Sequence, residues 1–423
     1  MGPDSQPAVR RLDLGVLDAL RGLAALYVLL YHAWGLLWLG GIDPAAYERL
    51  TGAGPAFHVN PEVVGRLLRF GQEAVLLFFL LSGFCIHYRQ ACRARAGGPA
   101  GGLGGFQARA FFRRRAARLY PTLLAALALT AVLDAFGSRL YPPLYNGGVA
   151  ALSQAGWIVP VSYDVPTLLG NLLMQTDLWV HRFGSNGPLW SLAFEWWYYA
   201  TYPGLLWLMA RLGPLRAVRG VAAVSLGAAA ILSVAGGPWP LRVAACWAAW
   251  AGGALVAEAY AGNVGTRTLR RRGPLALAIG AMLYLGGAQS TGWLEVTAWS
   301  LVLGCGLAYL LLCLPPALAR QVERCARPLR PLADLSYPLY VTHFPVLLLC
   351  AAWWLSGHAR LPAGIELGAL GLAAALALAC AVWHLVEKRS QPPRPAGADR
   401  VAAYNRPLDA ERGRLALPPV RAA

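Results

Sequence analysis

The chain has 423 residues, of which 57% are hydrophobic and only 13% are charged, and its formal net charge is +17. Soluble domains contain about 25% charged residues, so this chain lacks much of the surface charge that keeps a globular or disordered protein in water. The composition excludes a soluble domain and predicts a protein that crosses a membrane several times.

Ten runs of mostly apolar residues are long enough to be membrane-spanning helices, which need about 20 residues each. These runs are 14–38, 72–91, 119–137, 187–210, 217–235, 240–261, 274–289, 294–314, 334–356 and 363–386. Between the third and fourth runs, residues 165–183 are too polar to span, so we expect an interfacial or re-entrant segment on the outer face. The predicted fold class is an all-α polytopic membrane protein, a bundle of about ten transmembrane helices.

The positive residues indicate the orientation of this bundle. With the N-terminus in the cytoplasm, 29 Lys and Arg residues fall on the inner side and 7 on the outer side. Cytoplasmic loops carry such an excess, so both termini are predicted to be cytoplasmic in a multi-pass protein of the cell (inner or plasma) membrane. The same bias explains the net charge without nucleic acid. We expect residues 1–390 to form the membrane domain and the Pro/Arg-rich tail 391–423 to be disordered and cytoplasmic.

Four ionisable residues are predicted to lie well inside spans, where a charge is costly and needs a reason: Arg21, His32, Glu195 and His343. Asp134 and Glu258 were assigned to span ends instead. The eight cysteines show no CxxC or Cys/His spacing, so neither a metal site nor a disulfide is expected.

Arg21 and His32 lie eleven residues apart in the first run, which puts both on one helix face, roughly 16 Å apart along the axis. Asp18 precedes Arg21 by three positions and is a natural partner for its guanidinium. This helix therefore presents a cation near the inner side and an imidazole near the outer side. The alternative is a snorkelling arginine and a packed histidine.

Two later runs and one loop add further candidates. Glu195 follows Ser191 by four positions in a Trp/Tyr-rich helix, and His343 ends a series of aromatic residues spaced by three. Arg115 and Arg118 lie one helical turn apart just before the third run. Taken singly, these features also fit an aromatic packing seam and a basic cluster that only sets the topology.

Together these fragments resemble the acyltransferase-3 family of integral membrane acyltransferases, which includes bacterial surface-polysaccharide O-acetyltransferases. The resemblance is carried, in family order, by LDALRGLAALYVLLYH, LFFLLSGFCI, FFRRRAARLYP, GPLWSLAFEWWYYATYP and LSYPLYVTHFPV. It implies a ten-helix bundle, an acyl-CoA donor bound from the cytoplasm, and essential Arg21/His32 and Arg115/Arg118 pairs. Family members often place a proline soon after an acidic residue at the end of the last span. Here Arg389 takes that place after Glu387, which leaves the role of Glu387 open.

The expected function is transfer of an acyl group, here acetyl, from acyl-CoA to a hydroxyl of a saccharide, glycolipid or similar acceptor, with no permanently bound cofactor. Neutral His32 suits the general base, and His343 is the rival base. Arg115 and Arg118 suit the CoA phosphates. Arg21 would hold the donor or neutralise an anion, and Glu195 would orient an imidazole or bind acceptor hydroxyls.

Two other classes compete with this interpretation. A proton-coupled transporter would use His32, Glu195 and His343 as a relay, but it leaves Arg115 and Arg118 unexplained, and the chain shows no internal repeat. A polyprenyl-phosphate glycosyltransferase would need paired acids in an outer loop, for which only Asp164 and Asp177 are available.

Overall fold

The computed structural model describes residues 12–38, 61–95, 106–154, 156–267, 292–362 and 365–390, with four single positions between 274 and 282. This part of the chain is helical, and its β-structure is limited to two isolated bridges, Ser162–Phe183 and Thr176–Val180. The long helices are α1 (Gly15–Leu37), α4 (Gly71–Arg95), α5 (Ala108–Leu140), α8 (Leu189–Leu212), α9 (Pro214–Ala235), α10 (Trp239–Ala261), α12 (Trp293–Cys313), α14 (Leu332–Gly357) and α15 (Glu366–Val382). The shorter elements are α3 (Pro61–Leu68), η1 (Pro142–Leu144), α6 (Ala150–Gln154), α7 (Val165–Leu172), α13 (Pro316–Ala326), η2 (Arg327–Leu329), η3 (Trp383–Glu387) and α16 (Lys388–Ser390).

Eight helices in the described residues are long and apolar enough to cross a membrane, which confirms the predicted all-α polytopic class. They are α1, α4, α5, α9, α10, α12, α14 and the stretch Glu366–Ser390. Helix α8 is 24 residues long, but its Trp and Tyr residues and Glu195 make it less apolar than these eight. The predicted span at 274–289, apart from its four single positions, and the predicted disordered tail at 391–423 lie outside the described residues.

Helix α5 is longer than the predicted span at 119–137. It begins at Ala108 and has 33 residues, which is about 50 Å at 1.5 Å per residue. Hydropathy falls at the run of arginines, so a prediction based on apolar length ends there, whereas Ala and Arg both favour a helical backbone. As a result, Arg115 and Arg118 lie on the helix itself and not in a loop before it.

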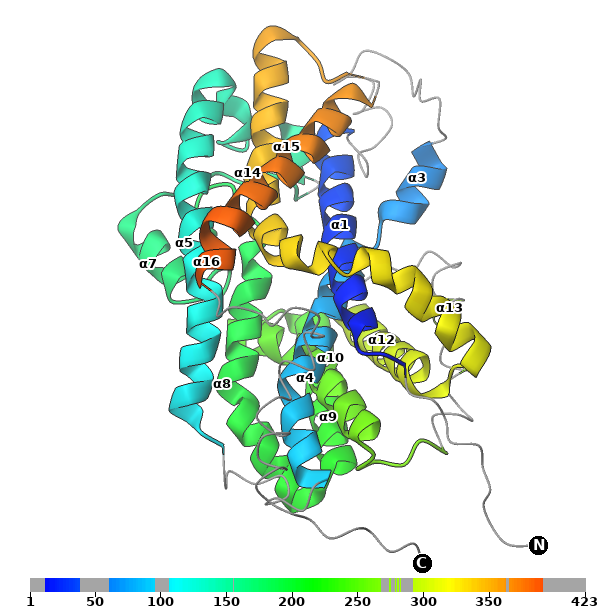
Figure 1. Cartoon of the computed structure of the whole chain (residues 1–423). Coiled ribbons are helices and arrows are strands. Elements are labelled where there is room, and N and C mark those ends of the chain that lie inside the picture. Colours follow the sequence, from blue (N-terminus) through cyan, green and yellow to red (C-terminus); the bar gives the residue numbers. More distant parts are fainter. Residues whose placement is uncertain are drawn as a thin grey trace, which may run out of the picture.

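The helices form two groups that meet around α1 and α4 (Figure 1). Helix α1 packs against α14, α4 and α15, and α10 packs against α4, α9 and α12. Two glycines bring α4 and α10 into close contact. A Cβ atom at Gly83 would lie 1.9 Å from the Trp250 carbonyl oxygen, and one at Gly253 would lie 1.9 Å from that of Leu80. Glycine at both positions lets the two backbones approach, as small residues do between membrane helices.

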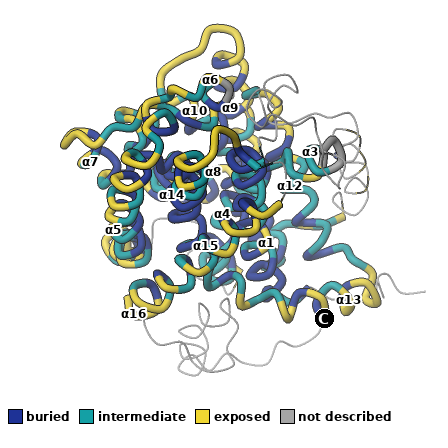
Figure 2. Tube along the Cα trace, turned by 90° about the horizontal axis from the view of Figure 1, so that it is seen from above, coloured by how far each residue is buried: buried dark blue, intermediate teal, exposed yellow. Residues whose placement is uncertain are grey.

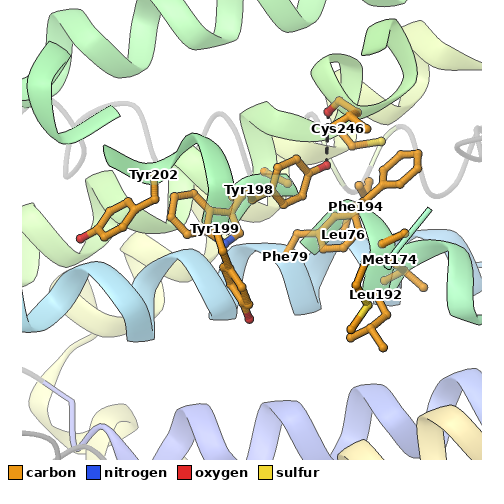
Figure 3. Packing of buried hydrophobic residues seen from close by; sticks show 14 of the residues in the cluster. Leu76, Phe79, Met174, Leu192, Phe194, Tyr198, Tyr199, Tyr202 and Cys246 are labelled. Carbon is orange, nitrogen blue, oxygen red and sulfur yellow. Dashed lines mark hydrogen bonds between the residues drawn. The ribbon is translucent and has the colours of Figure 1, made fainter. Parts of the chain in front are cut away.

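Aromatic rings fill much of the core beside this crossing. Tyr198, Tyr202 and Phe79 are almost completely buried, and the rings of Phe79 and Tyr198 meet edge to face (Figure 3). The exposed residues lie mostly along the periphery of the bundle (Figure 2), and large apolar residues are among them. Phe136 is 58% exposed and Val234 is 90% exposed. Such an apolar exterior is expected of a protein whose solvent is lipid.

The predicted non-spanning segment runs beside α5 and contains α7. Its N-cap Asp164 accepts hydrogen bonds from Ser162 Oγ and Thr167 N, which lower the pKa of that carboxyl group. The segment contacts α5 at two levels, through Tyr120 Oη, which donates to Leu172 O, and through Asp134. The fourteen positions between these α5 residues correspond to about 21 Å, so the segment enters the depth of the bundle and returns.

Asn171 holds this re-entrant segment together. Its amide nitrogen donates to Thr167 O and His181 O, at 2.8 and 2.9 Å, and its amide oxygen accepts from Thr176 Oγ1 and Phe183 N. Non-helical backbone at membrane depth needs such internal partners, because lipid offers none. Asn171 is 1% exposed, so this network keeps the loop in place without water.

Candidate functional site

Two predicted site residues from distant parts of the sequence meet in the bundle. His32 on α1 and His343 on α14 lie side by side, with 3.0 Å between His32 Nδ1 and His343 Nε2. Each Nδ1 atom also lies 3.0 Å from the carbonyl oxygen four residues earlier in its own helix, Val28 O for His32 and Leu339 O for His343. The sequence analysis treated the two histidines as rivals, whereas the structure makes them a pair.

The hydrogen bonds of this pair define where the protons lie. A carbonyl oxygen can only accept, so Nδ1 of each ring carries a hydrogen. In this tautomer His343 Nε2 can only accept, so the single hydrogen of His32 Nδ1 is shared between Val28 O and His343 Nε2. Both rings are neutral in this arrangement, and His32 Nε2 keeps its lone pair. No partner for His32 Nε2 is found among the described residues, so this nitrogen can take a proton from an incoming group.

Aromatic side chains enclose His32 on the side away from His343. The rings of Trp157 and Phe344 contact the imidazole edge to face, with centroids 5.9 and 5.3 Å away. The same two residues line a small pocket, with room for about one water molecule, together with Arg182, Ser185 and five apolar residues. The pocket lies among the segments predicted to face the outer side of the membrane. A molecule entering from that side would reach His32 past Trp157 and Phe344.

The polar wall of this pocket is held in place by Asp134 at the end of α5. Asp134 is completely buried and accepts from Ser185 N and Ser185 Oγ, both at 2.7 Å, and from Tyr163 Oη at 3.0 Å. Burial and the nearby carboxylate raise the pKa of Tyr163, so its hydroxyl remains a donor. Arg182 forms an ion pair with Asp177 at 3.5 Å. The sequence analysis placed Asp134 at a span end and missed this role.

Glu195 lies on α8, and the structure narrows the two roles that the sequence left open. Its Oε1 atom accepts from Ser82 Oγ at 2.5 Å and from Tyr199 Oη in a shorter hydrogen bond. Figure 3 shows Tyr199 pointing away from its neighbour Tyr198. Neither His32 nor His343 is among these partners. Because Glu195 and Ser82 are only partly buried, the carboxylate can still meet a ligand.

Arg21 lies near the N-terminal end of α1, which the charge bias predicts to be on the inner side. Its guanidinium is 3.7 Å from Asp18, the partner expected from the sequence, and Nη2 lies 3.4 Å from Cys85 Sγ. Cys85 follows Ser82 by three positions on α4, so Arg21 is about one helical turn from the Ser82–Glu195 contact. The side chain of Arg21 is 15% exposed.

Arg115 and Arg118 lie near the N-terminal end of α5, which the charge bias predicts to be on the inner side. Arg115 is buried, and its guanidinium carbon lies 5.9 Å from the centre of the Phe111 ring, one turn earlier. Arg118 is partly buried and interacts electrostatically with the Tyr337 hydroxyl group. The charges of Glu195 and Glu387 act on the same hydroxyl group. Arg115 interacts electrostatically with Tyr199, whose hydroxyl group donates to Glu195.

Glu387, whose role the sequence left open, is buried at the end of a π-helical turn, η3. Such turns insert one extra residue per hydrogen-bonded ring and often occur at functional sites. The electrostatic interaction with Tyr337 places Glu387 near the inner arginines, although no proline follows it closely.

A second buried polar cluster was missed by the sequence analysis. His87 on α4 lies inside the span predicted at 72–91, and Glu258 was assigned to a span end, yet the two are in contact. His87 Nε2 is 2.7 Å from Glu258 Oε1, and His87 Nδ1 is 3.1 Å from Tyr202 Oη. The signal available in the sequence was the single histidine within an otherwise apolar run.

The described residues contain no group of three His, Cys, Asp or Glu side chains arranged to hold a metal ion. All eight cysteines have free thiols.

The fold and this site define an integral membrane protein with a hydrogen-bonded pair of histidines inside its helical bundle. The chain belongs to an acyltransferase family, because the profile described as "Acyltransferase domain" matches residues 14–384. It is also 30% identical over 202 residues to nodulation protein 10 of Rhizobium leguminosarum bv. viciae. That match covers 45% of this chain and 43% of the relative. No solved structure matches the chain. The chain is thus a member of a family of acyltransferases, and this assignment argues against both the transporter and the glycosyltransferase hypotheses.

Proposed function

We propose that the protein transfers an acetyl group from acetyl-CoA to a hydroxyl group of a saccharide or similar acceptor at the cell membrane. The observation that carries the proposal is the His32–His343 pair, which leaves His32 Nε2 able to accept a proton. Its ring contacts Trp157 and Phe344, two residues that line the outer pocket. A neutral imidazole is the side chain best suited to act as a base near neutral pH.

The donor site is assigned to the inner end of the bundle. Arg115 and Arg118 offer two guanidinium groups, which pair well with phosphates, and they lie on the side where cytoplasmic acyl-CoA arrives. The extended pantetheine arm would then pass Arg21 and Glu195 towards His32. Arg21 and His32 are eleven positions apart on α1, roughly 16 Å along the axis.

The acceptor site is assigned to the outer pocket. Trp157 offers an aromatic face, and Arg182 with Asp177 offers donors and acceptors for hydroxyl groups. This assignment supports transfer inside the bundle, with the acyl group presented from within and the acceptor entering from outside. Glu195 is then closer to the donor arm than to the acceptor, which favours a role in binding the donor.

The chemical step follows from these positions. The acceptor oxygen attacks the thioester carbonyl as its proton passes to His32 Nε2. A C–O bond forms, the C–S bond breaks, and the proton moves from His32 to the CoA thiolate. The products are an ester and CoA with a free thiol.

The test is an assay of purified protein with labelled acetyl-CoA and candidate saccharides, in which free CoA thiol and label on the acceptor are both measured. Thiol release that depends on an acceptor and disappears in His32→Ala is expected. An intact thioester in the presence of every hydroxyl acceptor would contradict the proposal. Mass spectrometry of surface glycans, glycolipids and secreted metabolites, with and without the gene, would identify the acceptor.

A further inference from the structure

The buried cluster of His87, Tyr202 and Glu258 lies outside the path assigned to the reaction. It joins three helices, α4, α8 and α10, at the ends that the charge bias places on the inner side. His87 and Tyr202 are 2% and 1% exposed, so water does not compete for their hydrogen bonds. Because burying polar side chains is costly, we expect this network to have a function.

Every polar atom at the centre of this cluster has a partner. Glu258 is taken as ionised, so it only accepts, and His87 Nε2 donates to it at 2.7 Å. With a neutral ring, His87 Nδ1 accepts from the hydroxyl of Tyr202 at 3.1 Å. Asn263 Nδ2 donates to the other Glu258 oxygen and to Ala91 O, at 2.5 and 2.9 Å. A fully satisfied network of this kind is rigid.

The ring of Tyr202 connects this rigid network to α5. Its centre lies 5.5 Å from that of Phe111 and 5.6 Å from that of Phe106. Phe111 lies one turn before Arg115, whose guanidinium carbon is 5.9 Å from the Phe111 ring centre. The Tyr202 hydroxyl, seen at the end of its ring in Figure 3, is fixed by His87, and the ring in turn fixes the face on which Arg115 lies.

We propose that His87, held by Glu258, is a positioning residue that acts through Tyr202 and Phe111 to aim Arg115 at the acyl-CoA phosphates. The inference rests on the proposed donor site at Arg115. None of the three cluster residues touches the donor. Instead they restrict the conformations of the Arg115 side chain, whose guanidinium group must bind a phosphate in one geometry.

The experiment measures kcat and the KM for acetyl-CoA in His87→Leu, His87→Gln and Tyr202→Phe. His87→Leu removes both hydrogen bonds, and we expect it to raise the KM for acetyl-CoA about 5- to 10-fold, the size of one net hydrogen bond, with kcat little changed. Tyr202→Phe keeps the ring but frees it from His87, so a similar rise is expected. His87→Gln offers one donor and one acceptor at similar reach, and it should restore most of the affinity.

A double-mutant cycle separates this role from a purely structural one. If His87 acts through Arg115, then His87→Leu raises the KM in the parent protein but not in an Arg115→Gln background. An equal rise in both backgrounds, or a loss of thermal stability with an unchanged KM, would overturn the inference. If Arg115→Gln itself left the KM for acetyl-CoA unchanged, this result would contradict the proposed donor site and not only the role of His87. If Arg115→Gln raised the KM for acetyl-CoA and His87→Leu did not, the role of His87 would be contradicted and the donor site would stand.

Discussion

His343 Nε2 accepts a hydrogen bond from His32 Nδ1 at 3.0 Å, although the two residues are 311 positions apart in the chain. The contact assigns different tasks to the two imidazoles. His343 is 1% exposed and uses both ring nitrogens within the bundle, while His32 keeps Nε2 available. In the proposed reaction His32 therefore acts as the base that meets the acceptor, and His343 orients it.

Replacing His32 with Ala should reduce turnover by roughly 10²–10⁴-fold, the usual contribution of general acid–base catalysis. Binding of CoA should change little, because the arginines assigned to its phosphates lie at the other end of the bundle. Steady-state kinetics and isothermal titration with CoA measure the two effects separately. A variant that bound CoA normally and still turned over at the parent rate would show that His32 is not the base.

Replacing His343 with Ala should slow the reaction by a smaller factor, about 10²-fold, the size of effect that misplacement of a catalytic group can produce. His343→Gln should recover part of the rate, since its amide can donate to Leu339 O and accept from His32. Both variants are compared with His32→Ala in the same assay. If His343→Ala abolished transfer and His32→Ala did not, the two roles would be reversed.

Replacing Arg115 or Arg118 with Ala should weaken CoA binding by about 1.5–3 kcal/mol, the range for hydrogen bonds to charged groups. The loss should shrink as salt is added, since salt screens the attraction between the guanidinium groups and the CoA phosphates. Arg113→Ala is the matched control, because Arg113 is exposed on the same helix. Equal losses in all three variants would indicate a general effect of positive charge and not a specific phosphate site.

The span predictions succeeded where one physical signal dominated. The apolar runs 14–38 and 334–356 became α1 and α14 with ends shifted by only one or two residues. Arg115 was placed before a span and not on it, because hydropathy measures partition into lipid and not the backbone preference of Ala and Arg. Helical periodicity put Arg21 and His32 on one face, yet it carries no information on which helix that face meets. The contact with His343 needed the structure.

The burial of Asp134 and Glu258 was not predicted, for a different reason. Asp134 and Glu258 were assigned to span ends, where a carboxylate can reach water, but the re-entrant segment covers the first and His87 pairs with the second. Burial by a distant part of the chain cannot be read from a local window. The single histidine at position 87 was the one local sign of such a partner.

Asp134→Ala should destabilise the protein by more than most substitutions, because it leaves the Ser185 amide and hydroxyl without their acceptor. Each buried donor that loses its partner costs about 1–3 kcal/mol. Thermal unfolding in detergent should show the loss, and the KM for the acceptor should rise as Ser185 and Arg182 shift. Ser138→Ala, four positions later on the same helix, is the control, since its hydroxyl makes only a 3.5 Å contact with Ala135 O. Equal unfolding midpoints in the two variants would contradict the role of Asp134.

The orientation of the bundle can be tested on α5 alone, because one continuous helix carries an exposed arginine near each end, Arg109 and Arg139. The thirty positions between them correspond to about 45 Å, more than the hydrocarbon thickness of about 30 Å. In a variant without native cysteines, Arg109→Cys should react with a membrane-impermeant maleimide only after the cells are opened. Arg139→Cys should react in intact cells. The reverse pattern would place Arg115 outside, where cytoplasmic acyl-CoA cannot reach it, and would remove the basis of the donor site.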